Sequence, residues 1–291
     1  MKHSIRKFLI RINQCRIQEE EQKNSAIIKC CGERGAVLVK KNIYKIIAII
    51  AGVAAVACAA VGGYKYYQEK HAGDNYEEVR ETVKKETEPA PVEEKAPVEI
   101  PIDFAALQEQ NPEVYAWIQI QDTNIDYPIL QREGDNGYYL DHTIDGEKKT
   151  EGSIFTEDYN SKDFEDPNTV IYGHDMKNGS MFQNLLSYQD KDFFDNHKDV
   201  IIYTPDAIRH YQVFAAYLYD DRHLMQSFDF NIKSVYQAYL DSIFAIRDMS
   251  AKIDTSQNVS VDDKIITLST CYGNQSDKRF LVQAVLVSIE K

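Results

Sequence analysis

The sequence predicts a mainly β domain, an eight-stranded closed or nearly closed barrel with short helices and one long inserted helix, preceded by a single transmembrane helix. Three observations indicate this: short β-branched and aromatic runs, their similar spacing, and an uncharged apolar segment near the N-terminus. Asp, Asn, Gly and Pro bound the runs, as is typical of strands and turns. About eight strands of similar spacing favour a barrel. The predicted strands are Ala116–Ile120, Ile125–Leu130, Ser153–Thr156, Thr169–Tyr172, Val200–Tyr203, Tyr211–Tyr219, Lys264–Thr270 and Phe280–Ser288.

Charge divides the chain of 291 residues into two unequal parts. Residues 1–45 contain 11 Lys and Arg against 4 Asp and Glu, whereas residues 64–291 contain 22 against 42. The acidic part has no basic patch interleaved with aromatic residues, so we expect no nucleic acid as a partner. Hydrophobic residues make up 43% of the chain, which excludes a wholly disordered protein.

Between the two parts lies Ile46–Gly63, a run of 18 residues without a charge. As a helix this run is about 27 Å long, close to the thickness of the hydrocarbon core, and Ile43 and Tyr44 extend it. Lysines precede the run, and tyrosines and then acidic residues follow it. The positive-inside rule therefore predicts a single-pass signal anchor in the cell membrane, with a cytoplasmic N-terminus and an extracellular acidic domain.

Three alternatives exist for this apolar run. A cleaved signal peptide is disfavoured because about 45 residues precede the apolar core, far more than a usual n-region. A lipoprotein signal ending at Cys58 is disfavoured because Ala59, Ala60 and Val61 continue the run. A buried core helix is the third alternative.

Composition divides the chain into four segments. Residues 1–42 form the predicted cytoplasmic tail, and residues 43–63 form the transmembrane signal anchor. Residues 64–101 are rich in Glu, Lys and Pro, a composition that predicts an extended, semi-rigid stalk with at most a short exposed helix over Tyr76–Thr87. Residues 102–291 have a globular pattern to the end and are expected to form one domain.

Helices interrupt the predicted strands at three places. Asp103 can cap a short helix, Phe104–Gln110, which has to end before Pro112. Ser180 is expected to cap a second short helix. The longest helix covers about 232–249, where apolar residues recur at spacings of three and four and predict a face that packs on the core.

Cys271 is the one cysteine of the predicted extracellular domain, since the other four lie in the tail and the apolar run. No intramolecular disulfide can form there, although the compartment would permit one. Cys271 ends a β-branched run, and Arg279 opens the next apolar strand after a seven-residue polar loop. Antiparallel pairing would bring both to one rim of the sheet, an accessible, electropositive position that favours a reactive thiolate. A buried cysteine with a surface arginine is the alternative.

A cysteine nucleophile needs a proton partner, usually a histidine. Of the five histidines in the domain, His174 directly follows a buried strand and Gly173, where the chain leaves the sheet at a rim. The others are expected in exposed loops or at a hairpin. They are His142, His197, His210 and His223.

The sequence offers no pattern for a bound group. It contains no GxGxxG, no phosphate-binding loop, no HExxH and no paired CxxC. No acidic cluster is recognisable as a calcium site. We therefore expect neither a cofactor nor a metal ion.

Several motifs resemble the sortase transpeptidases. Residues 267–271 read TLSTC, Arg279 opens the following strand, and residues 171–176 read IYGHDM. The resemblance covers about 103–291 and extends to class B sortases, which implies a sortase-type barrel. The further matching segments are WIQIQDTNIDYPILQ at 117–131, YYLDH at 138–142, GSIF at 152–155, NGSMFQNLLSY at 178–188 and the long helix at about 232–249.

The resemblance implies roles for three residues. Cys271 would be the nucleophile, His174 the general acid and base, and Arg279 the donor that holds the substrate and stabilises the oxyanion. The enzyme would be a sortase B-type cysteine transpeptidase on the outer face of a Gram-positive cell. It would cleave the C-terminal sorting signal of a secreted protein after Thr, through a thioacyl-enzyme, and transfer that protein to an amine of a peptidoglycan precursor. The signal would be NPxTN-like or LPxTG-like.

The resemblance also indicates substrate contacts and leaves alternatives. Ser269 and Thr270 correspond to residues that line the family's groove, and 219–230 corresponds to the region that contacts the sorting signal; the alternative for Ser269 and Thr270 is that they only hold the strand. Pilin polymerisation is the alternative activity within the family. A non-catalytic surface module that binds wall peptides or a partner protein is the alternative from another class.

Overall fold

The computed structural model describes residues 33–71, 74–84, 98–273 and 275–291, with residues 33–49 described by their backbone only. Most of the predicted cytoplasmic tail and residues 85–97 of the predicted stalk lie outside the described residues. The chain forms two compact units, one up to Tyr66 and one from Tyr67 to Lys291.

Helix α2 runs from Glu33 to Lys70 and contains the whole of the predicted span 43–63. In the part of the chain that the structure describes, no helix is both long enough and apolar enough to cross a membrane. The side chains of residues 43–49 of the predicted span lie outside the described part.

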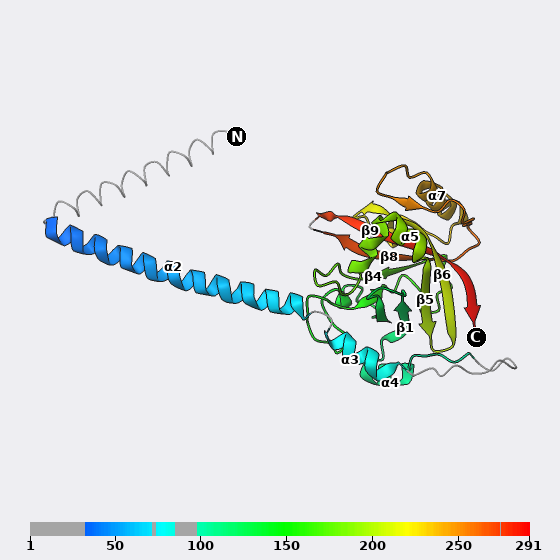
Figure 1. Cartoon of the computed structure of the whole chain (residues 1–291), viewed down its shortest axis with the longest axis horizontal. Helices are drawn as coiled ribbons and strands as arrows, with labels where there is room; N and C mark the ends of the chain where they lie inside the picture. Colours follow the sequence, from blue (N-terminus) through cyan, green and yellow to red (C-terminus); the bar gives the residue numbers. More distant parts are fainter. Residues whose placement is uncertain (1–32, 72–73, 85–97, 274) are drawn as a thin grey trace. The chain divides into compact units, whose positions relative to one another are not determined.

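The sheet of the second unit closes on itself. In the described residues the strand order is β5-β1-β2-β3-β4-β8-β9-β6-β7, and a further pairing joins β5 to β6. The first eight strands of this order form a closed ring, so the predicted eight-stranded barrel is confirmed (Figure 1). The strands are β1 Val114–Gln119, β2 Asp126–Leu130, β3 Ile154–Thr156, β4 Asn168–Tyr172, β5 Asp199–Thr204, β6 Ala207–Asp220, β7 Lys252–Ile253, β8 Ile265–Tyr272 and β9 Gln275–Glu290.

Two of the predicted helices form, and the longer one is shorter than predicted. Asp103 caps α4, Phe104–Gln110, by accepting the backbone N–H of Ala106 at 3.1 Å, as predicted. The long helix α7 covers only Lys233–Phe244. It ends there because Arg247 donates from Nη1 to the carbonyl oxygens of Phe244 and Ile246, which satisfies acceptors that a further turn would need.

The prediction that Ser180 caps a short helix is wrong. Its hydroxyl donates to the Asn178 side chain at 2.7 Å, and the chain becomes helical only at η2, a 3₁₀ helix over Gln183–Gln189. The remaining short helices are η1 Tyr138–Leu140, α5 Lys191–Asn196 and α6 Leu224–Ser227.

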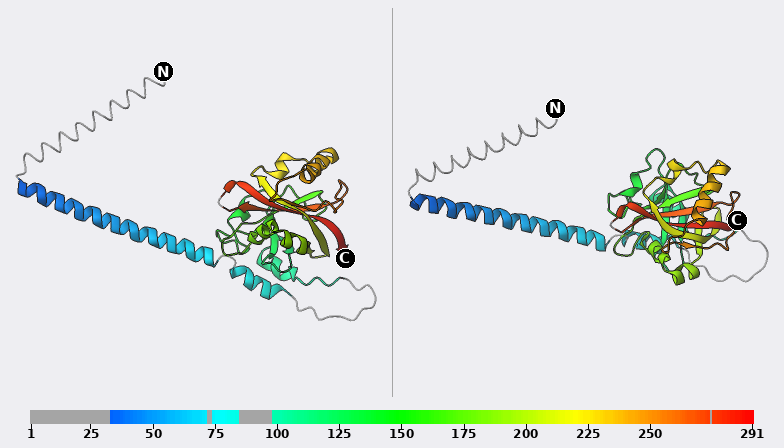
Figure 2. Two further views of the ribbon diagram at one scale, coloured as in Figure 1. Left: turned by 45° about the horizontal axis from the view of Figure 1, so that its top comes forward. Right: turned by 90° about the horizontal axis from the view of Figure 1, so that it is seen from above.

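Apolar side chains form two buried clusters in the second unit. One includes barrel residues such as Trp117, Ile154 and Leu268, and the other joins α7 to the sheet through residues such as Phe214 and Tyr239. Helix α7 lies on the opposite side of the barrel from α3 (Asp74–Val83) and α4 (Figures 1 and 2).

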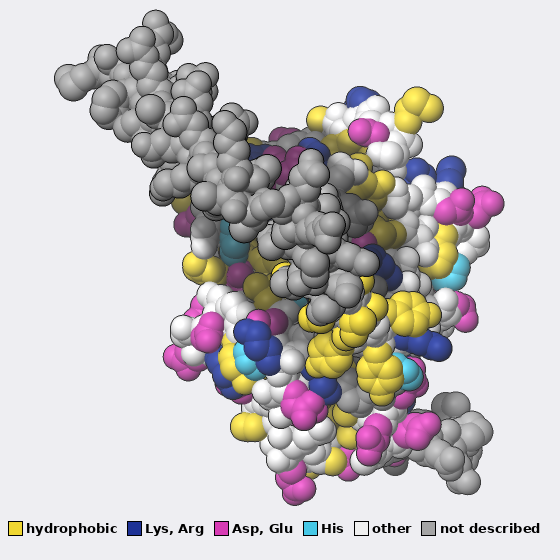
Figure 3. Space-filling view, turned by 90° about the vertical axis from the view of Figure 1, so that its left-hand side faces the viewer, with side chains coloured by type: hydrophobic (Ala, Val, Ile, Leu, Met, Phe, Trp, Pro, Cys, Tyr) yellow, Lys and Arg dark blue, Asp and Glu magenta, His cyan; other side chains and the backbone are white. Residues whose placement is uncertain are grey.

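Charged side chains of both signs occupy the same surface. On the face shown in Figure 3, Lys and Arg side chains lie among Asp and Glu side chains. Ion pairs such as Arg132–Glu113 and Lys198–Asp254, both at 2.9 Å, repeat this pattern elsewhere. The surface charge of this face is therefore mixed, although acidic residues are more numerous in the chain.

Helix α3 packs on the barrel, so the prediction of an unpacked stalk is wrong for residues 74–84. Tyr76 is completely buried, and Val79 and Val83 are at most 6% exposed. The Tyr76 hydroxyl bonds the carbonyl oxygen of Gly152 at 2.8 Å and the Ser153 hydroxyl at 3.0 Å. Burial raises the pKa of Tyr76 above its ordinary range, so the hydroxyl remains a donor. Tyr76, Val79 and Val83 recur at helical spacing and form one apolar face, and burial of this face packs the helix on the barrel although the segment is rich in charged residues.

Substitution of Tyr76 should measure this packing. We expect Tyr76→Ala to lower the free energy of unfolding by about 3–5 kcal/mol, because a large buried ring is lost. Tyr76→Phe keeps the ring and loses one buried hydrogen bond, which should cost about 1–2 kcal/mol. Chemical denaturation of the full chain gives both values. Two variants as stable as the wild type would mean that the segment is an unpacked stalk after all.

Candidate active site

Cys271 and Arg279 face each other across the β8–β9 hairpin. They are direct partners in the antiparallel register, as Ser269 and Leu281 are two residues earlier. Because side chains alternate between the faces of a strand, these four residues share one face of the sheet. The expectation that strand pairing brings the thiol and the guanidinium to one rim is confirmed.

The turn of this hairpin is shorter than predicted. Instead of a seven-residue loop, β8 continues through Tyr272 and β9 begins at Gln275, with a register shift after Cys271. Gly273 lies in the turn with a φ of 53°, a left-handed conformation that glycine adopts without strain. Cys271 is therefore held within a strand, near its end, and is partly exposed.

His174 reaches the same end of the barrel through the parallel pairing of β4 with β8. Tyr172 is the register partner of Ser269, and the N–H of Gly173 donates to the carbonyl of Ser269 at 3.1 Å. His174 lies two residues beyond Tyr172, and Cys271 lies two residues beyond Ser269. Parallel strands run in the same direction, so the two residues leave the sheet at the same edge.

Close packing around Gly173 governs where His174 lies. A Cβ atom at this position would lie 2.5 Å from Cδ1 of Ile154 and 2.7 Å from the ring of Phe182. Both neighbours are fully buried. Only glycine fits between them without displacing the chain that carries His174.

The His174 ring has a defined hydrogen bond. Its Nε2 lies 2.6 Å from the carbonyl oxygen of Leu140. A carbonyl oxygen only accepts, so Nε2 carries the proton and the neutral ring has its lone pair on Nδ1. Nδ1 is therefore the ring atom able to take up a proton.

Asp175 ties the histidine segment to the cysteine hairpin. Its Oδ2 accepts the N–H of Gly273 at 3.2 Å, which joins the residue after His174 to the turn after Cys271. Burial raises the pKa of Asp175 above its ordinary value of 3.8, although the Gly273 hydrogen bond acts in the opposite direction. This bond connects the ends of β4 and β8 beyond the last ladder hydrogen bond.

A pocket of about 220 Å³ is lined by Arg279, the register partner of Cys271, whereas Cys271 and His174 are not among its lining residues. Ser269, Leu281 and Arg279 line it from β8 and β9, and Leu140, the acceptor of His174, lines it from η1. The predicted contact region 219–230 borders it as well. The other lining residues are Asn136, Phe155, Glu157, Tyr172, Tyr219, Asp221, Arg222, His223 and Leu224.

The two residues predicted to contact a substrate differ in position. Ser269 lines the pocket, whereas Thr270 is 2% exposed and pairs with buried Phe280 on the other face of the sheet. Neighbouring residues of a strand point to opposite faces, so Thr270 does not line this pocket, and its contact with a substrate stays a prediction.

The sequence does not predict the contact between two pocket residues, Glu157 and His223, although His223 lies in the expected contact region 219–230. Glu157 stood in no motif, and His223 was expected in an exposed loop. In the structure, Nε2 of His223 lies 2.7 Å from Oε2 of Glu157, and the two side chains are 28% and 14% exposed. Their separation in the sequence gives no signal of this contact, which only the fold creates.

Known proteins resemble this chain in sequence and in fold. The family model of the sortase domain matches residues 118–287, more than half of the chain. The chain belongs to the sortase family. Sortase B of Listeria monocytogenes is 36% identical over 192 residues, which are 65% of this chain and 76% of that protein.

Solved sortase structures have the same fold. The crystal structure of sortase B from B. anthracis matches with a TM-score of 0.60 and 32% identity, over 77% of this chain and 98% of that one. The Staphylococcus aureus sortase B–substrate complex matches with a TM-score of 0.57 and 30% identity, over 64% and 84% of the two chains. The resemblance to class B sortases is confirmed, and these relatives support a cysteine transpeptidase.

Replacing Asp175 by Asn should change how the stability of this sortase depends on pH. A raised pKa means that the folded chain keeps a proton that the unfolded chain releases, so folding stability falls as pH rises from about 4 through the raised pKa. Asn cannot ionise and keeps an acceptor for Gly273. We expect the wild type to lose stability relative to Asp175→Asn over this rise in pH.

Denaturation of both proteins at several pH values tests this, because all other carboxyl groups contribute equally and cancel. Asp175→Ala, which removes the acceptor as well, is the control for the hydrogen bond. A constant difference between wild type and Asp175→Asn at every pH would contradict the expectation.

Proposed function

We propose that this sortase cleaves a C-terminal sorting signal after Thr, through a thioacyl-enzyme on Cys271, and transfers the protein to an amine of a cell-wall precursor. One observation supports this most directly. The strand register puts Cys271 opposite Arg279 and at the same sheet edge as His174, beside a pocket. Nucleophile, base and cationic donor are the three groups that acyl transfer needs.

In the proposed acylation step, Nδ1 of His174 takes the proton of the Cys271 thiol, and the sulfur attacks the carbonyl carbon of the signal's Thr. The carbonyl oxygen becomes negatively charged in the tetrahedral intermediate. The C–N bond then breaks, and His174 returns the proton to the leaving amine. A thioester between Cys271 and the Thr carbonyl remains.

Arg279 is placed to stabilise the negative charge that develops in this step. It shares the face of Cys271 and lines the pocket, and its Nη1 donates to the carbonyl oxygen of Lys278 at 3.0 Å. That hydrogen bond orients the planar guanidinium at the pocket. A cation held beforehand at the position of the oxyanion costs no reorganisation during the reaction.

The second step of the proposed reaction reverses the first with a new nucleophile. An amine attacks the thioester, His174 takes a proton from it, and the sulfur leaves as the thiol of Cys271 is restored. One amide bond is broken and another is made, so the exchange balances without an oxidant or reductant.

The pocket provides the proposed binding site for the signal peptide. Besides Ser269 and Arg279, it is lined by Tyr219, whose hydroxyl is buried and has no hydrogen-bond partner among the described residues. A buried hydroxyl without a partner is costly, and a bound peptide can supply one. The Staphylococcus aureus relative has been solved as a substrate complex. Peptides of the NPxTN and LPxTG types are the proposed substrates.

We also propose that the chain is anchored in the cell membrane, with its sortase domain outside. The uncharged run 46–63 lies within one uninterrupted helix, and Lys40, Lys41 and Lys45 precede it. The positive-inside rule then favours a cytoplasmic N-terminus. An external domain would meet both secreted proteins and cell-wall precursors.

Intact-protein mass spectrometry tests the proposed chemistry. The full chain in mild detergent and its Cys271→Ala variant are incubated separately with NPxTN-like and LPxTG-like peptides. We expect the wild type alone to gain the mass of the peptide fragment that ends in Thr, and hydroxylamine to remove it, since it cleaves thioesters. The variant keeps four cysteines, so it controls for reaction at other thiols. No adduct with either peptide type would overturn the proposal.

Arg279 should affect turnover more than binding. We expect Arg279→Ala to lower kcat about 10²–10³-fold, the usual effect of losing one oxyanion donor. Arg279→Lys keeps the charge but not the planar fork, so its kcat should lie between those of Ala and wild type. Steady-state cleavage of a quenched peptide gives both constants. A raised KM with unchanged kcat would show that Arg279 binds substrate only.

A further inference from the structure

Three side chains from separate elements meet at one wall of the pocket. Glu157 directly follows β3, Tyr172 ends β4, and His223 directly precedes α6. The Tyr172 hydroxyl donates to Oε2 of Glu157 at 3.2 Å, and Nε2 of His223 lies 2.7 Å from the same oxygen. All three residues line the pocket that also contains Arg279.

Glu157 is the rigid side of this contact. The Gln131 side chain donates to its backbone carbonyl at 3.0 Å, and Gln131 is only 5% exposed. Burial and the nearby Glu157 carboxylate raise the pKa of Tyr172 above its ordinary range, so this phenol remains a donor. The carboxylate is thus held in place from the barrel before His223 reaches it.

His223 is the link to the segment around α6. Its Nδ1 accepts the N–H of Gln226 at 3.3 Å and caps the helix. An accepting Nδ1 carries no proton, so the proton of the neutral ring lies on Nε2. Nε2 is buried and lies 2.7 Å from Oε2 of Glu157, a close polar contact that lacks the alignment of a hydrogen bond. The side chain therefore joins the segment that it caps to the barrel.

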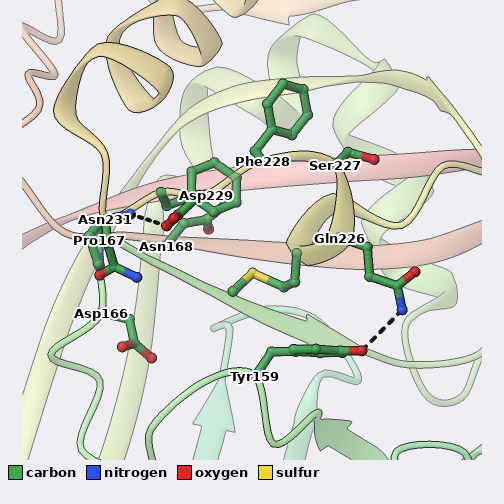
Figure 4. A pocket seen from close by; sticks show the side chains of 11 residues that line it. Tyr159, Asp166, Pro167, Asn168, Gln226, Ser227, Phe228, Asp229 and Asn231 are labelled. Carbon is green, nitrogen blue, oxygen red and sulfur yellow. Dashed lines mark hydrogen bonds between the residues drawn. The ribbon is translucent and has the colours of Figure 1, made fainter.

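Tyr159, two residues after Glu157, makes further contacts with the α6 segment. Its ring lies edge-on to the His223 ring, with centroids 5.5 Å apart. The Gln226 side chain donates to its hydroxyl at 3.1 Å, and Figure 4 shows the two side chains pointing toward each other. α6 has only four residues, so contacts of this kind hold it in place rather than its own helical hydrogen bonds.

We propose that His223 is a positioning residue for sorting-signal binding. Its contact with Glu157 holds the α6 segment against the barrel and thereby keeps the pocket beside Arg279 in shape for the peptide. This inference rests on the proposed function of the pocket. It assigns His223 no proton transfer and no contact with the reacting atoms.

Two substitutions distinguish the role of His223 as the N-cap of α6 from its contact with Glu157. His223→Asn keeps a side-chain acceptor for Gln226, since Asn is among the best N-caps, but cannot reach Glu157. His223→Ala loses both. We expect each variant to raise KM for the peptide that acylates Cys271 about 10-fold, as the loss of a close polar contact with a charged group weakens the hold on the α6 segment, with kcat within about twofold of wild type. If His223 served only as a cap, His223→Asn would behave like the wild type.

The double variant and a matched control complete the kinetic test. Glu157→Ala removes the carboxylate, and His223→Asn should have no further effect on KM in that background, because both changes break one contact. His210→Asn is the control, since His210 lies 2.8 Å from Glu290 in a similar pair that does not line the pocket. Additive effects of the Glu157 and His223 changes, or an equal effect at His210, would overturn the proposal.

A measurement without substrate separates this inference from the proposed function. In denaturation, the free energies of unfolding of the two single variants and the double variant should be non-additive if the contact exists. Additive values would refute the contact itself, whatever the kinetics. If the wild type formed no adduct with either peptide type, the proposed function would fail and with it the role of His223 in binding, even where the unfolding data showed the contact.

Discussion

The parallel pairing of β4 with β8 is the constraint on which the active site depends. Tyr172 and Ser269 are register partners, and from that pair each chain continues for two residues to His174 and Cys271. A slip of one residue would turn one of the two side chains to the other face of the sheet, because the side-chain period of a strand is two. The register is itself held by buried side chains along both strands, among them Ile171 and Leu268.

The strand register of the β8–β9 hairpin likewise determines the position of the Arg279 guanidinium. Antiparallel partners share a face, so the register of β8 with β9 brings Arg279 beside Cys271. The ends of the strands are then joined by contacts outside the ladder, such as the bond from Gly273 to Asp175. The sheet thus carries the three residues of the proposed chemistry, while η1 and the segment around α6 contribute walls of the pocket.

Residues before the sortase domain also contribute to the folded unit. The family match begins at residue 118, yet α3 buries Tyr76 completely and bonds it to Gly152 and Ser153. Ser153 directly precedes β3, which pairs with β2 and β4. The helix is therefore part of the structure that supports the pocket wall at Glu157.

Local sequence patterns indicate the strands and the barrel, and motifs that resemble the sortases single out Cys271, His174 and Arg279 as the expected catalytic residues. Runs such as Thr169–Tyr172 contain β-branched residues, which favour strands, so these elements can be predicted locally. The relative positions of Cys271 and Arg279 follow from one antiparallel pairing. Two other features depend on contacts that form only in the folded chain. The burial of Tyr76 depends on partners distant in the chain, and its charged neighbours predict a solvated segment instead. The contact of His223 with Glu157 likewise joins two loops that no local pattern relates, because it arises only when the closed sheet brings their ends together.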